Sequence, residues 1–232
     1  MKQPETALIV GAGSGLSASL ARLFAKEGMR VALAARDTSK LASLVKETTA
    51  LPVACDAADP SQIEAMFAAV EAKWGVPELV VYNAGYRVRG PFVGLDPKEV
   101  ERTIRVTGYA GFLVAQAAAK RMLARGSGAI FFTGASASVK GYAESAPFAM
   151  GKFALRGLAQ SMARELAPKG IHVAHFVIDG GISRGGDPRA HERGADGMLV
   201  PDEIAKNYLH LFRQHRSAWT WEVELRPWVE RF

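Results

Sequence analysis

Short apolar runs alternate with longer segments of helical spacing along most of this chain, and this alternation constrains its fold more than any other feature. The apolar runs lie at residues 6–10, 30–35, 51–55, 78–82, 128–133, 171–177 and 218–225. The helical segments lie at residues 16–27, 40–48, 96–125, 148–167 and 203–212, with another beginning at Asp59-Pro60. Buried strands separated by helices form a parallel sheet with helices on both faces. The sequence therefore predicts a doubly wound α/β domain with seven parallel strands and a ligand site at their carboxyl ends.

Length and composition favour a single cytoplasmic domain over residues 1–232. A chain of 232 residues, 49% of them hydrophobic, can bury one sizeable core. No apolar run reaches the roughly 18–20 residues that a membrane-spanning helix needs, so we expect no membrane partner. Cys55 is the only cysteine, which makes an intrachain disulfide impossible and favours a reducing compartment.

The net charge of +6 is spread through the helical segments, and no block of five or six basic residues occurs. A nucleic-acid-binding surface needs such residues clustered on one face. The charge therefore indicates a solvated surface with some attraction for anionic ligands. We expect a small-molecule substrate and no nucleic-acid partner.

A glycine-rich turn, Gly11-Ala12-Gly13-Ser14-Gly15-Leu16-Ser17, follows the first apolar run and begins the first helical segment. Glycines there let the backbone approach a pyrophosphate, which the free N–H groups and positive end of a helix bind. Leu16 stands where Gly-x-Gly-x-x-Gly requires its last glycine, so that fingerprint fails. The turn predicts a nucleotide site, although the same glycines would also permit close packing alone.

Several motifs in this order and at this spacing resemble the short-chain dehydrogenase/reductase family, from Thr6 to about Leu225. The family's turn reads Thr-Gly-x-x-x-Gly-x-Gly, and this chain has Val10 and Ser17 at its first and last positions. Asn83-Ala84-Gly85 matches the family's Asn-Ala-Gly after the fourth strand. The resemblance implies a Rossmann-type fold that binds a nicotinamide cofactor.

The remaining cofactor motifs lie at the ends of other predicted strands. Asp56 matches an aspartate that hydrogen-bonds adenine, and Asp179-Gly180-Gly181-Ile182 lies where the family has Pro-Gly-x-Val/Ile beside the nicotinamide. The cofactor-binding residues implied by the resemblance are Gly11, Ser14, Gly15, Leu16, Arg36, Asp56, Ala57, Asn83, Ala84, Gly85, Lys152, Gly180 and Ile182.

Ala35-Arg36 at the end of the second apolar run favours NADP over NAD. An acidic residue at this point would accept a hydrogen bond from the ribose 2′-hydroxyl of NAD. We expect no carboxylate there to repel a 2′-phosphate, and the planar guanidinium of Arg36 can pair with one, with Lys40 assisting. The alternative is that Arg36 stacks over adenine without contacting the phosphate.

The resemblance also implies a tetrad of asparagine, serine, tyrosine and lysine, and this chain departs from it. By spacing, the tetrad positions fall on Thr107, Ala135, Phe148 and Lys152. Phe148 and Lys152 are four residues apart and therefore share a helix face. Phenylalanine has no proton to give, whereas Lys152 keeps its use in gripping the cofactor ribose.

Substitute proton donors are available near that position. Tyr142 lies six residues before Phe148, Tyr86 follows the Asn-Ala-Gly motif, and Ser136 lies beside Ala135, with Ser138 also close. Lys152 itself can act if burial lowers its pKa. His172 and His175 alternate with apolar residues on a strand, so we expect structural roles for them.

The segment 183–199 lies beyond the sixth predicted strand and holds glycines among charged residues. It is predicted to be a substrate lid or else a plain flexible loop. Its three arginines, Arg184, Arg189 and Arg193, make an anionic substrate conceivable.

Aromatic residues are concentrated near the C-terminus: Trp219, Trp221, Trp228 and Phe232. Aromatic residues on a last strand and tail usually cover a core or a subunit interface. Since family members associate through their long helices and last strand, we expect a homodimer or homotetramer.

Together these features predict an NADP-dependent oxidoreductase with a degraded tetrad. It would transfer hydride to an unidentified small carbonyl, imine or C=C substrate. The alternative is a catalytically inactive NADP(H)-binding sensor or scaffold module. No combination of His, Cys, Asp and Glu has the spacing of metal ligands.

Overall fold

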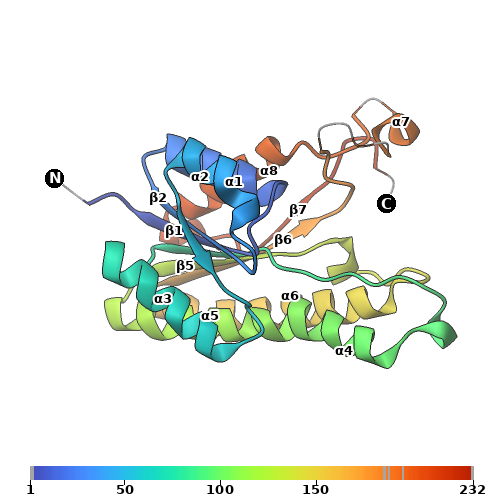
Figure 1. Ribbon diagram of the computed structural model, residues 1–232, viewed down its shortest axis with the longest axis horizontal. Coiled ribbons are helices and arrows are strands. Elements are labelled where there is room, and N and C mark those ends of the chain that lie inside the picture. The colour runs from blue at the N-terminus through green and yellow to red at the C-terminus, as the bar shows by residue number, and fades with distance from the viewer. Residues whose placement is uncertain (1–2, 185–186, 188, 195, 231–232) are drawn as a thin grey trace.

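A computed structural model of the chain describes residues 3–184, 187, 189–194 and 196–230 (Figure 1). Seven strands form one sheet in the order β3-β2-β1-β4-β5-β6-β7, and every neighbouring pair is parallel. The strands are β1 Thr6–Val10, β2 Arg30–Ala35, β3 Leu51–Ala54, β4 Leu79–Tyr82, β5 Gly128–Thr133, β6 Ile171–Ile178 and β7 Glu222–Leu225. The predicted doubly wound parallel sheet is therefore confirmed.

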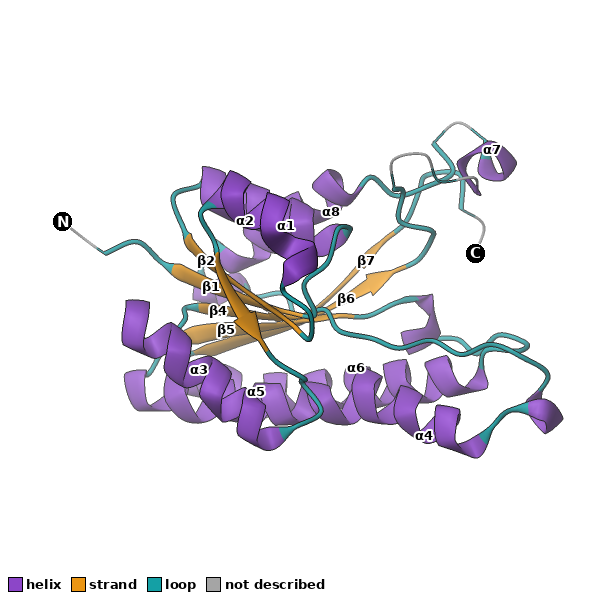
Figure 2. Ribbon diagram, in the orientation of Figure 1, coloured by secondary structure: helices purple, strands orange, loops and turns teal. Residues whose placement is uncertain are grey.

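Helices cover both faces of the sheet, as Figure 2 shows. On one face lie α1 Leu16–Lys26, α2 Ala42–Thr48 and α8 Pro201–Phe212. On the other face lie α3 Pro60–Trp74, α4 Pro97–Ile104, α5 Ala110–Arg125 and α6 Ala146–Leu166. A short helix, α7 Arg189–Arg193, lies beyond β6. No helix in the described part of the chain is both long and apolar enough to span a bilayer.

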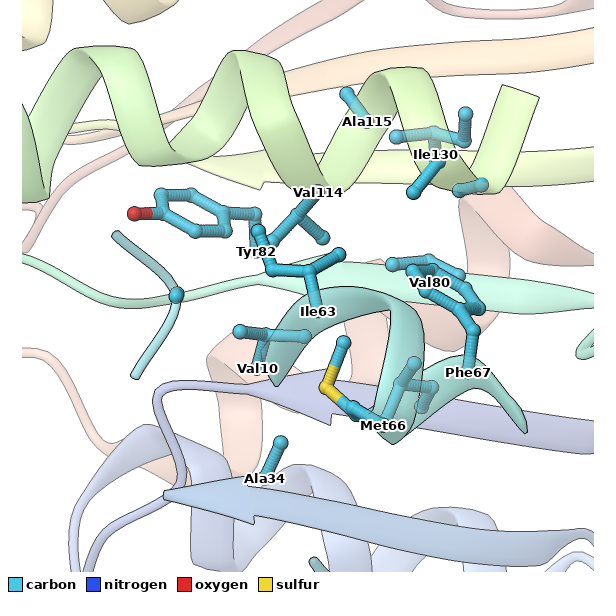
Figure 3. Packing of buried hydrophobic residues seen from close by; sticks show 14 of the residues in the cluster. Val10, Ala34, Ile63, Met66, Phe67, Val80, Tyr82, Val114, Ala115 and Ile130 are labelled. Carbon is cyan, nitrogen blue, oxygen red and sulfur yellow. The ribbon is translucent and has the colours of Figure 1, made fainter. Parts of the chain in front are cut away.

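Alternation along the central strands divides the core into two apolar layers. In β1, Leu8 and Val10 pack toward α3, α5 and α6, whereas Ala7 and Ile9 pack toward α1 and α8. Figure 3 shows the first layer, in which Phe67 of α3 lies against the sheet. Burying a side chain of that size contributes roughly 1.5–3 kcal/mol. Because the central strands are buried on both faces, their apolar runs are nearly continuous.

The largest difference from the sequence-based expectation lies in the predicted helix over 96–125. The structure has two α-helices there, joined by a π-helical turn at Arg105–Tyr109. The hydroxyl of Tyr82 donates to the carbonyl of Val106 within that turn, at 2.5 Å. A Cβ on Gly108 would lie 3.3 Å from the Ala154 Cβ of α6. The π-helical turn therefore lies close against α6. Turns of this kind are frequently found at functional sites.

The last strand and the C-terminal aromatic residues also differ in detail from expectation. β7 begins at Glu222, because residues 216–218 form a 3-10 turn instead of the start of a strand. Trp219 stacks on His172 at 4.8 Å between ring centroids, and Glu222 accepts from both Arg156 and His175. Both histidines thus have contacts within the fold. Of the predicted lid and aromatic tail, residues 185, 186, 188, 195 and 232 lie outside the described residues.

Two glycines of α6 provide a matched test of the helix contact. A Cβ on Gly151 would lie 2.8 Å from the Thr107 Cβ, whereas a Cβ on Gly157 would have nothing within 4 Å. Gly151→Ala should lower the free energy of unfolding by about 1–3 kcal/mol through overpacking. Gly157→Ala should raise it by about 0.5–1 kcal/mol through helix propensity. Urea denaturation measures both changes, and equal effects would contradict the close contact.

Candidate active site

Two adjoining cavities lie at the carboxyl edge of the sheet. The smaller one, of about 320 Å³, is lined by the ends of β1, β2, β3 and β4. The larger one, of about 800 Å³, is lined by the glycine-rich turn, the ends of β5 and β6 and the first turns of α6. Gly11, Asn83 and Gly85 line both cavities. The edge that the sequence indicated is therefore hollowed along much of its length.

The smaller cavity brings together the residues predicted for the adenosine side of a nucleotide. Arg36 is exposed at the end of β2, and Asp56 follows β3, where its Oδ1 accepts from the Ala58 N–H at 3.0 Å. The predicted residues that line this cavity are Gly11, Arg36, Lys40, Asp56, Ala57, Asn83, Ala84 and Gly85.

Asp37 corrects the expectation that no carboxylate lies at this end of β2, because it lines the same cavity as Arg36. Its Oδ1 accepts from the hydroxyl of Ser39 at 2.6 Å and from the Ser39 N–H at 3.0 Å. These hydrogen bonds lower the pKa of the Asp37 carboxyl. Lys40 Nζ lies 3.6 Å from the other oxygen. The carboxylate is thus ionised but already bound by its neighbours, which reduces its repulsion of an anion beside Arg36.

The glycine-rich turn is held against the end of β4. Gly11 has a φ of +86°, and a Cβ there would lie 2.4 Å from the Ala84 nitrogen, so no side chain fits. Ser17, which stands at the family's last glycine, donates from Oγ to the Gly11 carbonyl at 3.1 Å. The Asn83 side-chain amide donates to the same Oγ at 2.7 Å. Ser17 therefore joins the turn to the Asn-Ala-Gly segment.

A pyrophosphate fits the open side of this turn. A Cβ added to Gly13 or Gly15 would meet no atom within 4 Å. Helix α1 begins at its N-cap, Gly15, without a side-chain hydrogen bond and without an acidic residue in its first turn. Helix N-termini of this kind offer free N–H groups and a positive dipole to an anion. Four predicted cofactor residues of this turn lie at the cavities: Gly11, Ser14, Gly15 and Leu16.

Lys152 and Phe148 lie together in the larger cavity, as their spacing predicts. Lys152 is buried, and its Nζ donates to the Thr133 carbonyl at 2.6 Å. Burial lowers the pKa of Lys152 to about 8. Its Nζ lies 5.7 Å from the centroid of the Phe148 ring, and the Arg87 Cζ lies 5.1 Å from the same centroid. The ring of Phe148 is therefore in contact with two cations.

The other predicted catalytic residues are only partly brought together here. Ser136 and the half-exposed Tyr142 line the larger cavity, as do Gly180 and Ile182. Ser138 is buried, and its Oγ accepts from the Ala135 N–H at 3.1 Å, so its hydroxyl is directed at the backbone.

Thr107 and Tyr86 lie outside the residues that line the two cavities. Thr107 is fully buried, and its Oγ1 donates to the Tyr86 carbonyl and accepts from the Tyr86 N–H, both at 3.2 Å. The Tyr86 hydroxyl donates to Glu99 at 2.6 Å. Neither side chain is directed at the cavities: Thr107 instead supports the backbone that follows the Asn-Ala-Gly segment.

Residues at the larger cavity that the sequence-based set lacks include Ser145, Arg87 and Arg89. Ser145 is 1% exposed, and its Oγ has no hydrogen-bond partner within the described ranges. Serine followed closely by proline is a helix-start signal, and Ser145-Ala146-Pro147 begins α6 two residues earlier than predicted. Arg87 and Arg89 follow the Asn-Ala-Gly motif directly, which places them at the carboxyl edge of the sheet.

Comparisons with known proteins agree with this arrangement. Residues 5–183 match the family model described as short chain dehydrogenase. D-erythrulose reductase of Gallus gallus is 36% identical over 169 residues, which cover 72% of this chain and 67% of that protein. The structure of a short-chain dehydrogenase from Rhodopseudomonas palustris is 36% identical, with a TM-score of 0.84 over 98% of this chain and 100% of the other. A metagenomic short-chain oxidoreductase solved with NADP is 30% identical, with a TM-score of 0.84 over 96% and 97% of the two chains.

The buried amine of Lys152 should make stability depend on pH. Its folded pKa of about 8 lies below the ordinary 10.5, so between these values the unfolded chain binds the proton and the folded chain does not. The free energy of unfolding should therefore rise with pH across this window, by at most about 1.4 kcal/mol per unit. Lys152→Met should abolish that component, and Lys169→Met, at an exposed site, should keep it. Parallel urea-denaturation profiles for wild type and Lys152→Met would contradict the depressed pKa.

Proposed function

The chain belongs to the short-chain dehydrogenase family, and we propose that it is an NADP-dependent oxidoreductase acting on a small carbonyl, imine or C=C substrate. One observation carries the proposal: a cavity of about 320 Å³ lined by Arg36 adjoins a larger cavity lined by Lys152, and Gly11, Asn83 and Gly85 line both. A bound nicotinamide would supply or accept the hydride. The chain's own part is to bind and orient the two reactants and to manage the proton.

Arg36 and Lys40 support the choice of NADP. Both side chains are exposed at the smaller cavity, where the guanidinium of Arg36 can bind a 2′-phosphate and Lys40 offsets the charge of Asp37. Asp37 is held by Ser39 and Lys40, so the guanidinium of Arg36 stays available for that phosphate.

Phe148 in place of a tyrosine requires the proton to come from elsewhere, and we assign it to Lys152. An acid is most effective when its pKa lies near the working pH, and burial brings the pKa of Lys152 to about 8. One N–H of its ammonium is bound to the Thr133 carbonyl, which leaves two for a ribose hydroxyl and the substrate. Tyr142 and Ser136 are the alternative donors, since both line the larger cavity.

A second function, an inactive NADP(H)-binding sensor or scaffold, is favoured by the same substitutions. Phe148 and Ala135 carry no hydroxyl, and Thr107 is buried outside the cavities. Such a protein would retain the cofactor contacts and lack turnover with every substrate. Steady NADPH oxidation with any compound of a carbonyl and imine panel would exclude it.

Arg36→Ala should weaken NADP⁺ binding by about 10–100-fold, since a hydrogen bond to a charged group contributes roughly 1.5–3 kcal/mol. Binding of NAD⁺ should change less than threefold. Arg30→Ala, at the opposite end of β2, is the control and should bind both nucleotides like wild type. Calorimetric titrations with each nucleotide decide this, and binding of neither by wild type would overturn the proposed function.

Lys152→Met should lower kcat about 10²–10⁴-fold at saturating NADPH, which is the usual contribution of a general acid. Tyr142→Phe should lower it less than threefold. Stopped-flow or steady-state NADPH oxidation measures both, with nucleotide affinity determined separately for each variant. The reverse pattern would assign the proton to Tyr142.

Phe148→Tyr combined with Ala135→Ser tests whether the rest of the site supports tyrosine-based chemistry.

A further inference from the structure

Five guanidinium groups line the larger cavity. Arg87 and Arg89 come from the segment after β4, and Arg184, Arg189 and Arg193 come from the segment after β6. The two groups of arginines are about a hundred residues apart in the sequence and meet at one mouth. Neither segment by itself has a block of basic residues, so the positive charge of this site arises only from the fold.

Among the described residues, carboxylates neutralise only part of this charge. Arg189 pairs with Asp187 at 2.5 Å, and Arg193 pairs with Glu230 at 3.4 Å. Within the described ranges, no ion pair includes Arg87, Arg89 or Arg184, although the charge of Arg184 also acts on the Asp187 carboxylate.

The acidic residues that line the same cavity are already engaged. Asp179 lies 3.3 Å from the Lys140 amine and 3.5 Å from the Arg226 guanidinium, and Glu230 is bound by Arg193. In the described part of the chain, the cavity therefore offers cations without free carboxylates to balance them.

Keeping these cations together has an electrostatic cost. Burial, and then repulsion from Arg89 and Arg189, lowers the pKa of Arg87. Like charges held at one site attract a counter-ion, because an anion between them removes the repulsion. Guanidinium groups also present a planar pair of N–H donors that matches a carboxylate or phosphate.

Phe148 places this positive site beside the position of the chemistry. Arg87 lies against the Phe148 ring, with 5.1 Å between Cζ and the ring centroid, and Lys152 Nζ lies 5.7 Å from that centroid. The Arg87 guanidinium and the Lys152 amine are therefore less than about 11 Å apart, with the Phe148 ring in contact with both. A small substrate whose acid group is bound by Arg87 could therefore place its reactive carbon near the Lys152 amine.

We propose that the larger cavity selects anionic substrates, in which a carboxylate or phosphate group is held by Arg87, Arg89 and Arg184. The inference rests on the proposed function and names its substrate class. Phe148 then does more than lack a proton to donate, because the face of its ring orients the Arg87 guanidinium. Neutral carbonyl compounds of the same size would bind the site weakly.

The test uses the double variant Arg87→Gln/Arg89→Gln and malonate or inorganic phosphate as probes. Each probe is titrated at constant ionic strength into protein saturated with NADP⁺ and into protein without nucleotide, and the midpoint of thermal unfolding is measured. The control, Arg30→Gln/Arg164→Gln, removes two positive charges away from both cavities. Wild type and control should show a probe-dependent rise in midpoint at least threefold larger than that of the double variant.

Equal rises in the unfolding midpoint of all three proteins would overturn the inference. The probe that raises the midpoint of wild type more indicates which acid group the site prefers.

Calorimetry keeps this result separate from the proposed function. NADP⁺ affinity within twofold of wild type in the double variant supports substrate binding by the arginines. A loss above tenfold would mean that they bind the nucleotide phosphates, which overturns the inference alone. Absence of NADP⁺ binding in wild type would overturn the proposed function, while the titration without nucleotide still decides whether the arginines bind an anion.

Discussion

The contact between Gly11 and Ala84 sets the geometry of the whole carboxyl edge. β1 and β4 are neighbours in the sheet, and the turn after β1 approaches the segment after β4 so closely that a Cβ on Gly11 would lie 2.4 Å from the Ala84 nitrogen. The hydrogen bonds from Asn83 to Ser17 and from Ser17 to Gly11 hold the two segments in that position. The two cavities meet here, so under the proposed function this contact would set the relative placement of nucleotide and substrate.

Burial of Lys152 connects stability to function. Its ammonium lies in the interior with one backbone acceptor, the Thr133 carbonyl, and its pKa is lowered because water is excluded. Position 148 carries a phenylalanine, so the Lys152 amine faces an aromatic ring that has no hydroxyl. The folded protein thus keeps a partly satisfied cation where, under the proposed function, a ribose hydroxyl and a reacting atom would meet. Sites of this kind sacrifice some stability for the chemistry they allow.

Local sequence signals predicted the strands well, since a run buried on both faces has one plausible structure. Three strands, β1, β2 and β5, have the predicted bounds, and β3, β4 and β6 differ from the prediction by one residue each. Spacing was a weaker guide to side chains. It located Thr107 on the correct helix, yet the π-helical turn there directs its hydroxyl to the Tyr86 backbone. Tyr86 likewise follows the correct motif, and its hydroxyl is bound by Glu99. Register alone does not fix where a side chain points.

The sequence by itself determined the alternation of strands and helices along the chain and the glycine-rich turn, because each depends on neighbours within a few residues. It also carried the motifs on which the family resemblance rests. Tertiary structure alone decided that Asp37 is bound by Ser39 and Lys40 beside Arg36, that Ser145 is buried, and that arginines from two distant segments share one cavity. It also decided the pKa of Lys152. Burial and the distances between charges are properties of packing, and they arise from residues that are far apart along the chain.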